Sequence, residues 1–251
     1  MDPTLVLEAL RMGADGVLIA GCHPGDCHYH KGNFMMEKRF YYLKEAVKNV
    51  GIEPERVRLE WVSASEGGKW AALVREMVEE IRQLGPSPFR RLQIPKKTDA
   101  MIDAFKSQRL RWVVGRSQIK VEIDEGKYRQ TVDAIMHDET ERHMITGALK
   151  GKGPLTAEEL AHLTGLQPRK IVQHLIALRR DGKVNEAGEK NSQYLYQLSR
   201  SLITLHFFYA LRMNVAWKVM IVKVDFAFFD INFDMIMNRG SVQKVAIVFF
   251  S

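Results

Sequence analysis

"GVLIAGC", residues 16–22, is the stretch that decides the fold of the first part of the chain. Such an uninterrupted run of apolar and small residues is typical of a strand buried on both faces, as in a parallel sheet. The segments on either side, residues 4–13 and 34–51, have helical apolar spacing and both end on glycine. A buried strand between two helices predicts an α/β fold with an open parallel sheet.

The same alternation continues as far as residue 85. "VRLEWV", residues 57–62, predicts a second strand, and residues 63–85 predict a helix with Ser63 and Ser65 as its N-cap and the neighbour of that cap. Two strands are too few for a stable sheet. We therefore expect residues 1–85 to form a partial open parallel sheet with flanking helices, and an element before Met1 to be missing.

Charge and composition indicate which partners and which cellular compartment to expect. The net charge is +7, but residues 1–85 hold 11 basic and 13 acidic side chains, so the basic excess lies outside them. The cysteine segment therefore needs no polyanionic partner. An acid and a proline at the N-terminus argue against a signal peptide, and two cysteines give no disulfide framework. We expect a cytoplasmic protein that does not enter the membrane.

Both cysteines lie in "AGCHPGDCHY", residues 20–29. Cys22 follows the first strand, at the sheet edge where open α/β folds place their sites. Thiolates are soft ligands for zinc and iron-sulfur clusters, Gly25 allows a tight turn, and Asp26 or backbone amides can hydrogen-bond the sulfurs. The spacing alone leaves two alternatives for Cys22 and Cys27: a metal or cluster site, or a reactive or structural thiol pair.

Two longer stretches, "GADGVLIAGCHPGDCHYHKGNF" and "GIEPERVRLEWVSASEG", are more specific than the spacing. Over residues 2 to about 85 the chain resembles the delta subunit of methyl-viologen-reducing hydrogenase. This resemblance implies a two-iron, two-sulfur cluster with Cys22 and Cys27 among its ligands. It further implies electron transfer between a hydrogenase, or another donor, and the flavin-containing subunit of heterodisulfide reductase.

The resemblance also predicts that ligands are missing. Members of the family begin with another strand and a cysteine-rich stretch, whereas this chain opens at "MDP". We therefore expect an N-terminal truncation, with the remaining cluster ligands absent from this chain. Cys22 and Cys27 cannot complete a four-thiolate cluster alone. Substitution by His28 or His30 is the less favoured alternative, and we interpret His23 and His28 as loop residues that hydrogen-bond the backbone.

Residues 86–139 read as a linker followed by connecting elements. The linker "PSPFRRLQIPKK", residues 86–97, holds three prolines and four basic residues. A helix around 98–112, a strand at 117–123 and a turn at 124–126 are expected after it. None of these elements predicts a function.

Residues 140–199 have the order helix, helix, helix and hairpin, which predicts a mainly helical winged-helix domain. Thr156 with Glu159 predicts a capping box, and Pro168 predicts the start of the third helix. That helix carries the candidate nucleic-acid contacts Arg169, Lys170, Arg179 and Arg180. The alternative, which we favour, is a solvated basic face on a domain used for protein contact.

Residues 200–251 form an atypical tail with neither a steady helical nor a steady strand period. One hypothesis is a β-rich extension that pairs with a partner. The favoured one is a segment from a shifted reading frame that was never selected to fold, because local pattern and global fold agree only as far as Ser199.

These observations lead to one principal hypothesis of function and one competitor. The principal hypothesis is an electron-transfer iron-sulfur subunit of a hydrogenase and heterodisulfide reductase assembly, which is no stand-alone catalyst. The competitor is a winged-helix DNA-binding redox or metal sensor, in which the cysteine loop reorients Arg169 to Arg180.

Overall fold

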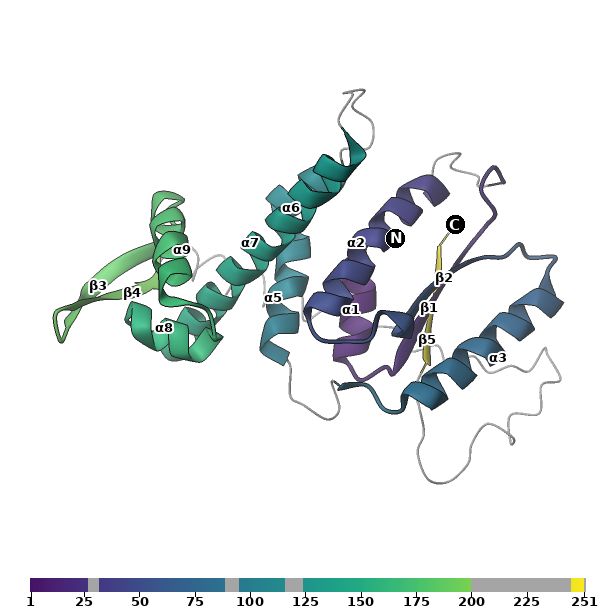
Figure 1. Cartoon of the computed structure of the whole chain (residues 1–251), viewed down its shortest axis with the longest axis horizontal. Coiled ribbons are helices and arrows are strands. Elements are labelled where there is room, and N and C mark those ends of the chain that lie inside the picture. The colour runs from purple at the N-terminus through teal and green to yellow at the C-terminus, as the bar shows by residue number, and fades with distance from the viewer. Residues whose placement is uncertain (27–31, 89–94, 116–123, 200–244, 251) are drawn as a thin grey trace, which may run out of the picture. The chain divides into compact units, whose positions relative to one another are not determined.

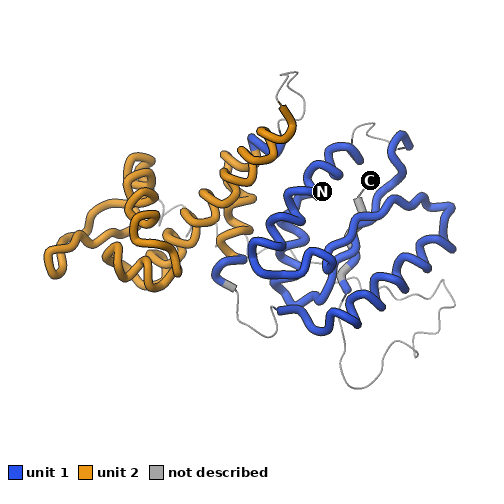
Figure 2. Tube along the Cα trace, viewed as in Figure 1, with its two compact units in different colours: residues 1–98, 112–122, 220–251 blue, residues 99–111, 123–219 orange. Residues whose placement is uncertain are grey.

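The computed structural model describes residues 1–26, 32–88, 95–115, 124–199 and 245–250. The chain divides into two units (Figure 2). Unit 1 comprises Met1–Thr98, Trp112–Glu122 and Met220–Ser251, and unit 2 comprises Asp99–Arg111 and Ile123–Val219. Among the described residues, none of the helices has both the length and the apolar character that crossing a bilayer requires.

Unit 1 is built on a three-stranded parallel sheet in the order β2-β1-β5 (Figure 1). The strands are β1 (Gly16–Gly21), β2 (Val57–Trp61) and β5 (Val245–Phe250). Every residue of β1 is buried, as the apolar run predicted for a central strand. Gly21 pairs with Trp61 on one side and with Phe250 on the other. The carboxyl ends of all three strands therefore meet at one sheet edge.

Helices cover both faces of this sheet (Figure 1): α1 (Pro3–Arg11) and α2 (Gly32–Asn49) lie on one face and α3 (Gly67–Leu84) on the other. Side chains alternate along a strand, so Leu18 points toward α3 and packs against Met77 and Ile81. Gly16 faces the same way, and a Cβ at this position would lie only 2.5 Å from Ile81 Cδ1. Glycine therefore permits the close approach of α3 to β1.

A buried arginine fixes the amino end of the sheet. Arg56 ends the short 3-10 helix η1 (Pro54–Arg56) directly before β2, and its side chain is fully buried. Its Nη1 donates to Asp15 O and to Gly85 O, both at 2.9 Å, and its Nε donates to Glu53 Oε2 at 2.7 Å. These bonds join the start of both strands to the end of α3. The guanidinium is thereby paired and hydrogen-bonded, as a buried charge requires.

The third strand comes from the far end of the chain. The tail was predicted not to form a native fold, whereas residues 245–250 pair with β1 of the same chain. A further element before Met1 stays a prediction. Val245 packs against the cluster of Leu18, Met77 and Ile81. Residues 200–244 lie outside the described part. A short apolar run such as "VAIVFF" is compatible with a strand, but its partner lies more than two hundred residues away, and local pattern carries no information about that pairing.

The connecting region is more helical than predicted. The single helix expected around 98–112 is two helices, α5 (Pro95–Lys106) and α6 (Gln108–Gly115), interrupted at Ser107, whose Oγ accepts the Leu110 N–H at 3.2 Å. The turn expected at 124–126 is wrong: Asp124 caps helix α7 (Glu125–Lys152) by accepting the Lys127 N–H. The strand predicted at 117–123 falls on residues that the structure does not describe.

Helices α8 (Ala157–Thr164) and α9 (Pro168–Arg180) and the hairpin β3 (Val184–Lys190) and β4 (Gln193–Leu198) follow α7 in unit 2. The capping box of Thr156 and Glu159 is confirmed. The expected boundary between residues 139 and 140 falls inside α7. An apolar core unites these elements and includes Ile145, Leu160, Ile171, Leu175 and Val184. An isolated bridge joins Leu155 to Tyr196 and ties the α7–α8 connection to the hairpin.

Candidate functional site

Cys22 lies at the edge where the three strands of unit 1 end. It directly follows Gly21, the last residue of β1, and its side chain is half-buried. The turn after it places Gly25 at φ +97, the left-handed region that glycine adopts freely. Cys27 lies outside the described residues, as do His28 and His30. The prediction that the first thiol sits at the carboxyl end of the central strand is confirmed for Cys22.

A buried asparagine holds the backbone around this thiol. Asn33 lies in the first turn of α2 and is fully buried. Its Nδ2 donates to Cys22 O at 2.7 Å and to His23 O at 2.8 Å, and lies 3.8 Å from Cys22 Sγ. Asn33 was not predicted from the sequence, which indicated Asp26 or backbone amides as hydrogen-bonding groups for the sulfurs. Asp26 is exposed, and its backbone N–H donates to His23 O at 3.0 Å.

The loops after β1 and β2 contact each other, as the shared sheet edge predicted. His23 Nε2 lies 2.6 Å from Glu66 Oε2, and the same carboxylate oxygen accepts the Ser63 N–H at 2.7 Å. Lys69 Nζ lies 3.9 Å from the other oxygen of Glu66. The hydrogen bond from the Ser63 backbone, then that from His23, lowers the pKa of Glu66 from 4.5 to about 2. Glu66 is therefore an ionised acceptor at neutral pH that joins the two loops.

The expected serine N-cap of α3 is wrong. Glu66 occupies the N-cap position without a side-chain cap bond, because its carboxylate points back to the Ser63 N–H and to His23. The hydroxyls of Ser63 and Ser65 lie 2.9 Å apart. The interaction with His23, 43 residues earlier in the chain, decides the conformation of Glu66, and sequence-local capping rules do not include it.

The described residues fit part of a metal-thiolate site. Cys22 offers one soft ligand, and the Asn33 amide N–H beside Sγ is the kind of donor that supports a metal-bound thiolate. Within the described ranges, the chain does not gather three or more His, Cys, Asp or Glu side chains in an arrangement that could hold a metal ion. Among the described residues, Cys22 offers one soft ligand, with the Asn33 amide beside its sulfur.

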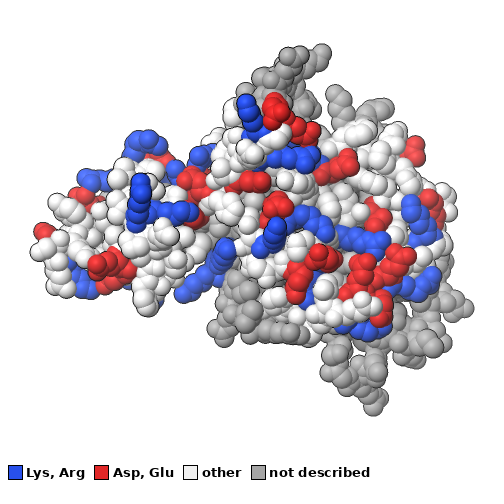
Figure 3. All heavy atoms as spheres, in the orientation of Figure 1, with Lys and Arg blue, Asp and Glu red and all other residues white. Residues whose placement is uncertain are grey.

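The basic residues of α9 have acidic partners within unit 2. Three of the four candidates form ion pairs: Lys170 with Glu141 at 2.5 Å, Arg179 with Glu186, and Arg180 with Asp181 at 3.6 Å. Arg169 is exposed and forms no ion pair with any described residue. Acidic and basic side chains are interspersed on the face shown in Figure 3. Three of the four basic side chains predicted to contact nucleic acid therefore lie beside an acidic side chain of the same unit.

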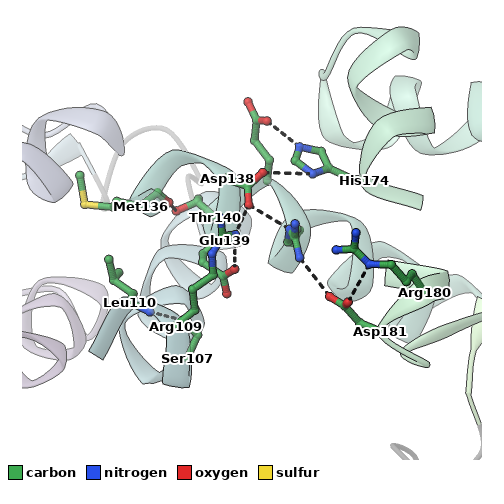
Figure 4. A network of polar contacts seen from close by, with 12 residues as sticks. Ser107, Arg109, Leu110, Met136, Asp138, Glu139, Thr140, His174, Arg180 and Asp181 are labelled. Atoms are coloured by element: carbon green, nitrogen blue, oxygen red, sulfur yellow. Dashed lines mark hydrogen bonds and ion pairs between the residues drawn. The ribbon is translucent and has the colours of Figure 1, made fainter. Parts of the chain in front are cut away.

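A network of charged side chains connects α7 to α9 (Figure 4). His174, which is buried, lies between two carboxylates: its Nε2 is 2.8 Å from Glu141 Oε2 and its Nδ1 is 3.6 Å from Asp138 Oδ1. Asp138 also pairs with Arg109 and with Arg142. These contacts orient α9 on α7, so the charged residues of this face contribute to packing between helices.

The segment that carries Cys22 is similar to known proteins. Residues 1–85 match the family described as methyl-viologen-reducing hydrogenase, delta subunit. The chain is 52% identical over 91 residues to the iron-sulfur subunit of the F420-non-reducing hydrogenase of Archaeoglobus profundus, a match that covers 36% of this chain and 66% of the relative. It is 45% identical over 86 residues to the vhc iron-sulfur subunit of the F420-non-reducing hydrogenase of Methanococcus voltae, covering 34% of this chain and 60% of that relative.

A second kind of relative carries a similar segment inside a much larger chain. This relative is one of the subunits of the ferredoxin/F(420)H(2)-dependent CoB-CoM heterodisulfide reductase of Methanosarcina acetivorans, and it is 48% identical over 86 residues. That match covers 34% of this chain and 11% of the reductase polypeptide. The chain thus spans just under two thirds of the hydrogenase subunits and about a tenth of the reductase polypeptide.

Proposed function

We propose that this protein is an electron-transfer subunit that connects a hydrogenase, or another electron donor, to heterodisulfide reductase. The observation that carries the proposal is the half-buried thiol of Cys22 at the common edge of three parallel strands, in a segment of the delta-subunit family. The relatives are named as iron-sulfur subunits of hydrogenases and as a subunit of heterodisulfide reductase. Together these support a redox role rather than bond-making catalysis.

In this proposal Cys22 and Cys27 hold a two-iron, two-sulfur cluster, and the remaining thiolates come from outside these 251 residues, which contain two cysteines. Such a cluster supplies one-electron transfer when it is bound. The part played by this chain is to position the ligands. The end of β1 fixes Cys22, Asn33 holds the Cys22 and His23 carbonyls, and Glu66 ties His23 to the neighbouring loop.

The proposed partners are hydrogenase subunits and the flavin-containing subunit of heterodisulfide reductase. In the Methanosarcina relative, a segment similar to 86 residues of this chain is part of a reductase subunit. The similar segment is part of a reductase subunit in one relative and part of a separate hydrogenase subunit in others, which supports docking of this chain to both enzymes. The thiol ligation proposed for Cys22 also favours a reducing compartment, the cytoplasm.

We further propose that residues 140–199 are a winged-helix domain. Support comes from the order α7, α8, α9, β3, β4 and from the bridge between Leu155 and Tyr196, which adds a third short strand contact to the hairpin. Because Lys170, Arg179 and Arg180 are ion-paired within the chain, we assign this domain to protein contact. Electrostatic binding to duplex DNA, with affinity that falls steeply as salt rises, would instead support the sensor hypothesis.

The experiment is anaerobic purification of the protein from its native source, followed by assays for iron, acid-labile sulfide and copurifying subunits. We expect iron and sulfide together with hydrogenase and heterodisulfide reductase subunits. A Cys22→Ser variant should lose the iron, whereas Ser65→Ala, at the same sheet edge, should retain it. Iron-free protein, or protein that copurifies with neither enzyme, would overturn the proposal.

A further inference from the structure

The first turn of α2 carries a buried polar side chain, that of Asn33, at a position where an apolar side chain could pack. Asn33 is fully buried, and its Oδ1 has no hydrogen-bond partner among the described residues. An unsatisfied buried acceptor costs about 1–3 kcal/mol. An apolar residue of similar size would avoid that cost, so the amide at this position calls for another explanation.

The other end of the same side chain supplies that explanation. Asn33 Nδ2 reaches two successive carbonyls, those of Cys22 and His23, at 2.7 and 2.8 Å, and lies 3.8 Å from the Cys22 sulfur. A donor in this place does two things. It fixes the peptide that carries the thiol, and it presents positive N–H character to the sulfur, which shifts the potential of a metal bound to it.

We infer that Asn33 is the positioning residue of the Cys22 ligand, which it holds through both carbonyls and supports by an N–H···S contact. The inference deepens the proposed function, because it rests on Cys22 being a cluster ligand. It assigns to α2 a direct part in the site, although that helix otherwise serves to cover the sheet. Asn33 acts through Cys22 and touches no substrate itself.

The first test uses metal-free protein that carries Cys27→Ser, so that Cys22 is the single thiol. Asn33→Asp keeps the size of the side chain and replaces the donor by a carboxylate. We expect the rate of Cys22 alkylation by iodoacetamide to change by about tenfold, because the variant loses the donor that holds the two carbonyls beside the thiol. Asn49→Asp, at the far end of α2, should leave the rate unchanged.

The second test requires no variant at position 33 and so does not depend on its folding. In protein labelled with nitrogen-15 and carrying Cys27→Ser, alkylation of Cys22 should shift the side-chain amide signals of Asn33 and leave those of Asn49 in place. Unshifted Asn33 signals would overturn the inference. So would an Asn33→Asp protein of native circular dichroism that alkylates at the parent rate.

A third measurement separates this inference from the proposed function. Once iron is loaded, Asn33→Asp should lower the midpoint potential relative to the parent, because the lost donor and the added charge both disfavour the reduced state. If the parent protein takes up no iron with its partners present, the proposed function fails. The alkylation rate and the amide shift, both measured without metal, still decide whether Asn33 positions Cys22. An unchanged potential in the loaded variant would count against the inference alone.

Discussion

His23 and Glu66, which follow different strands, are joined by a contact of 2.6 Å between Nε2 and Oε2. They are 43 residues apart in the chain, and the parallel pairing of β1 with β2 brings their loops to one sheet edge. The loop that carries Cys22 is therefore braced from two sides, by Glu66 after β2 and by Asn33 at the start of α2.

The carboxylate of Glu66 should remain ionised far into the acid range. Its pKa is about 2 in the folded protein, against an ordinary value of 4.5, because it accepts hydrogen bonds from the Ser63 N–H and from His23. A lowered folded-state pKa means that the stabilisation is complete above about pH 4.5 and is lost as the pH falls toward 2. Carbon-detected NMR titration of the Glu66 carboxyl checks this. His23→Gln should raise the midpoint of the Glu66 titration. A midpoint near the ordinary value of 4.5 in the parent protein would contradict the hydrogen bonds described for Glu66.

Replacing Arg56 should destabilise unit 1 strongly. Arg56→Met leaves the carbonyls of Asp15 and Gly85 without their donor, and we expect a loss of about 3 kcal/mol in the free energy of unfolding. Urea unfolding followed by circular dichroism measures it. Arg75→Met, at an exposed position of α3, is the matched control and should change stability by less than about 0.5 kcal/mol. Equal effects of the two variants would show that the Arg56 network contributes little.

Gly16→Ala should destabilise the same unit by overpacking. The added methyl would lie 2.5 Å from Ile81 Cδ1 and 2.9 Å from Met77 Cε, and such strain costs about 1–3 kcal/mol. Ile81→Val removes the crowded Cδ1 atom, so the double variant should be more stable than the sum of the two single effects. Thermal unfolding of the four proteins gives this coupling. Strict additivity would mean that Ile81 moves aside without cost.

Disrupting β5 should loosen β1. Val245 packs against Leu18, Met77 and Ile81, and Val245→Asp would place a charge against this apolar cluster. We expect faster hydrogen exchange of the β1 amides and a loss of about 2 kcal/mol or more in the free energy of unfolding. Ending the chain at residue 244 should have a similar effect. Val172→Asp, at an exposed position of α9, is the control. Unchanged exchange of the β1 amides in Val245→Asp would show that β5 is not part of the native sheet.

Much of the fold follows from local pattern. The apolar run at 16–21, the amphipathic spacing of α1 and α2, and the capping box of Thr156 and Glu159 each depend on neighbours within a few residues. The place of Cys22 also followed, since parallel strands gather their carboxyl ends at one edge. The residue motifs shared with the delta-subunit family identified the segment that the comparison then matched, residues 1–85.

Tertiary structure decided the rest. Four contacts join residues from different elements: the pairing of β5 with β1, the amide of Asn33 at the Cys22 carbonyl, the contact of Glu66 with His23, and the ion pair of Lys170 in α9 with Glu141 in α7. Periodicity and capping rules describe only interactions between residues that are close together in the sequence. Hydrogen bonds and ion pairs between distant segments form only once the packed fold has brought them together, so no local pattern could show them.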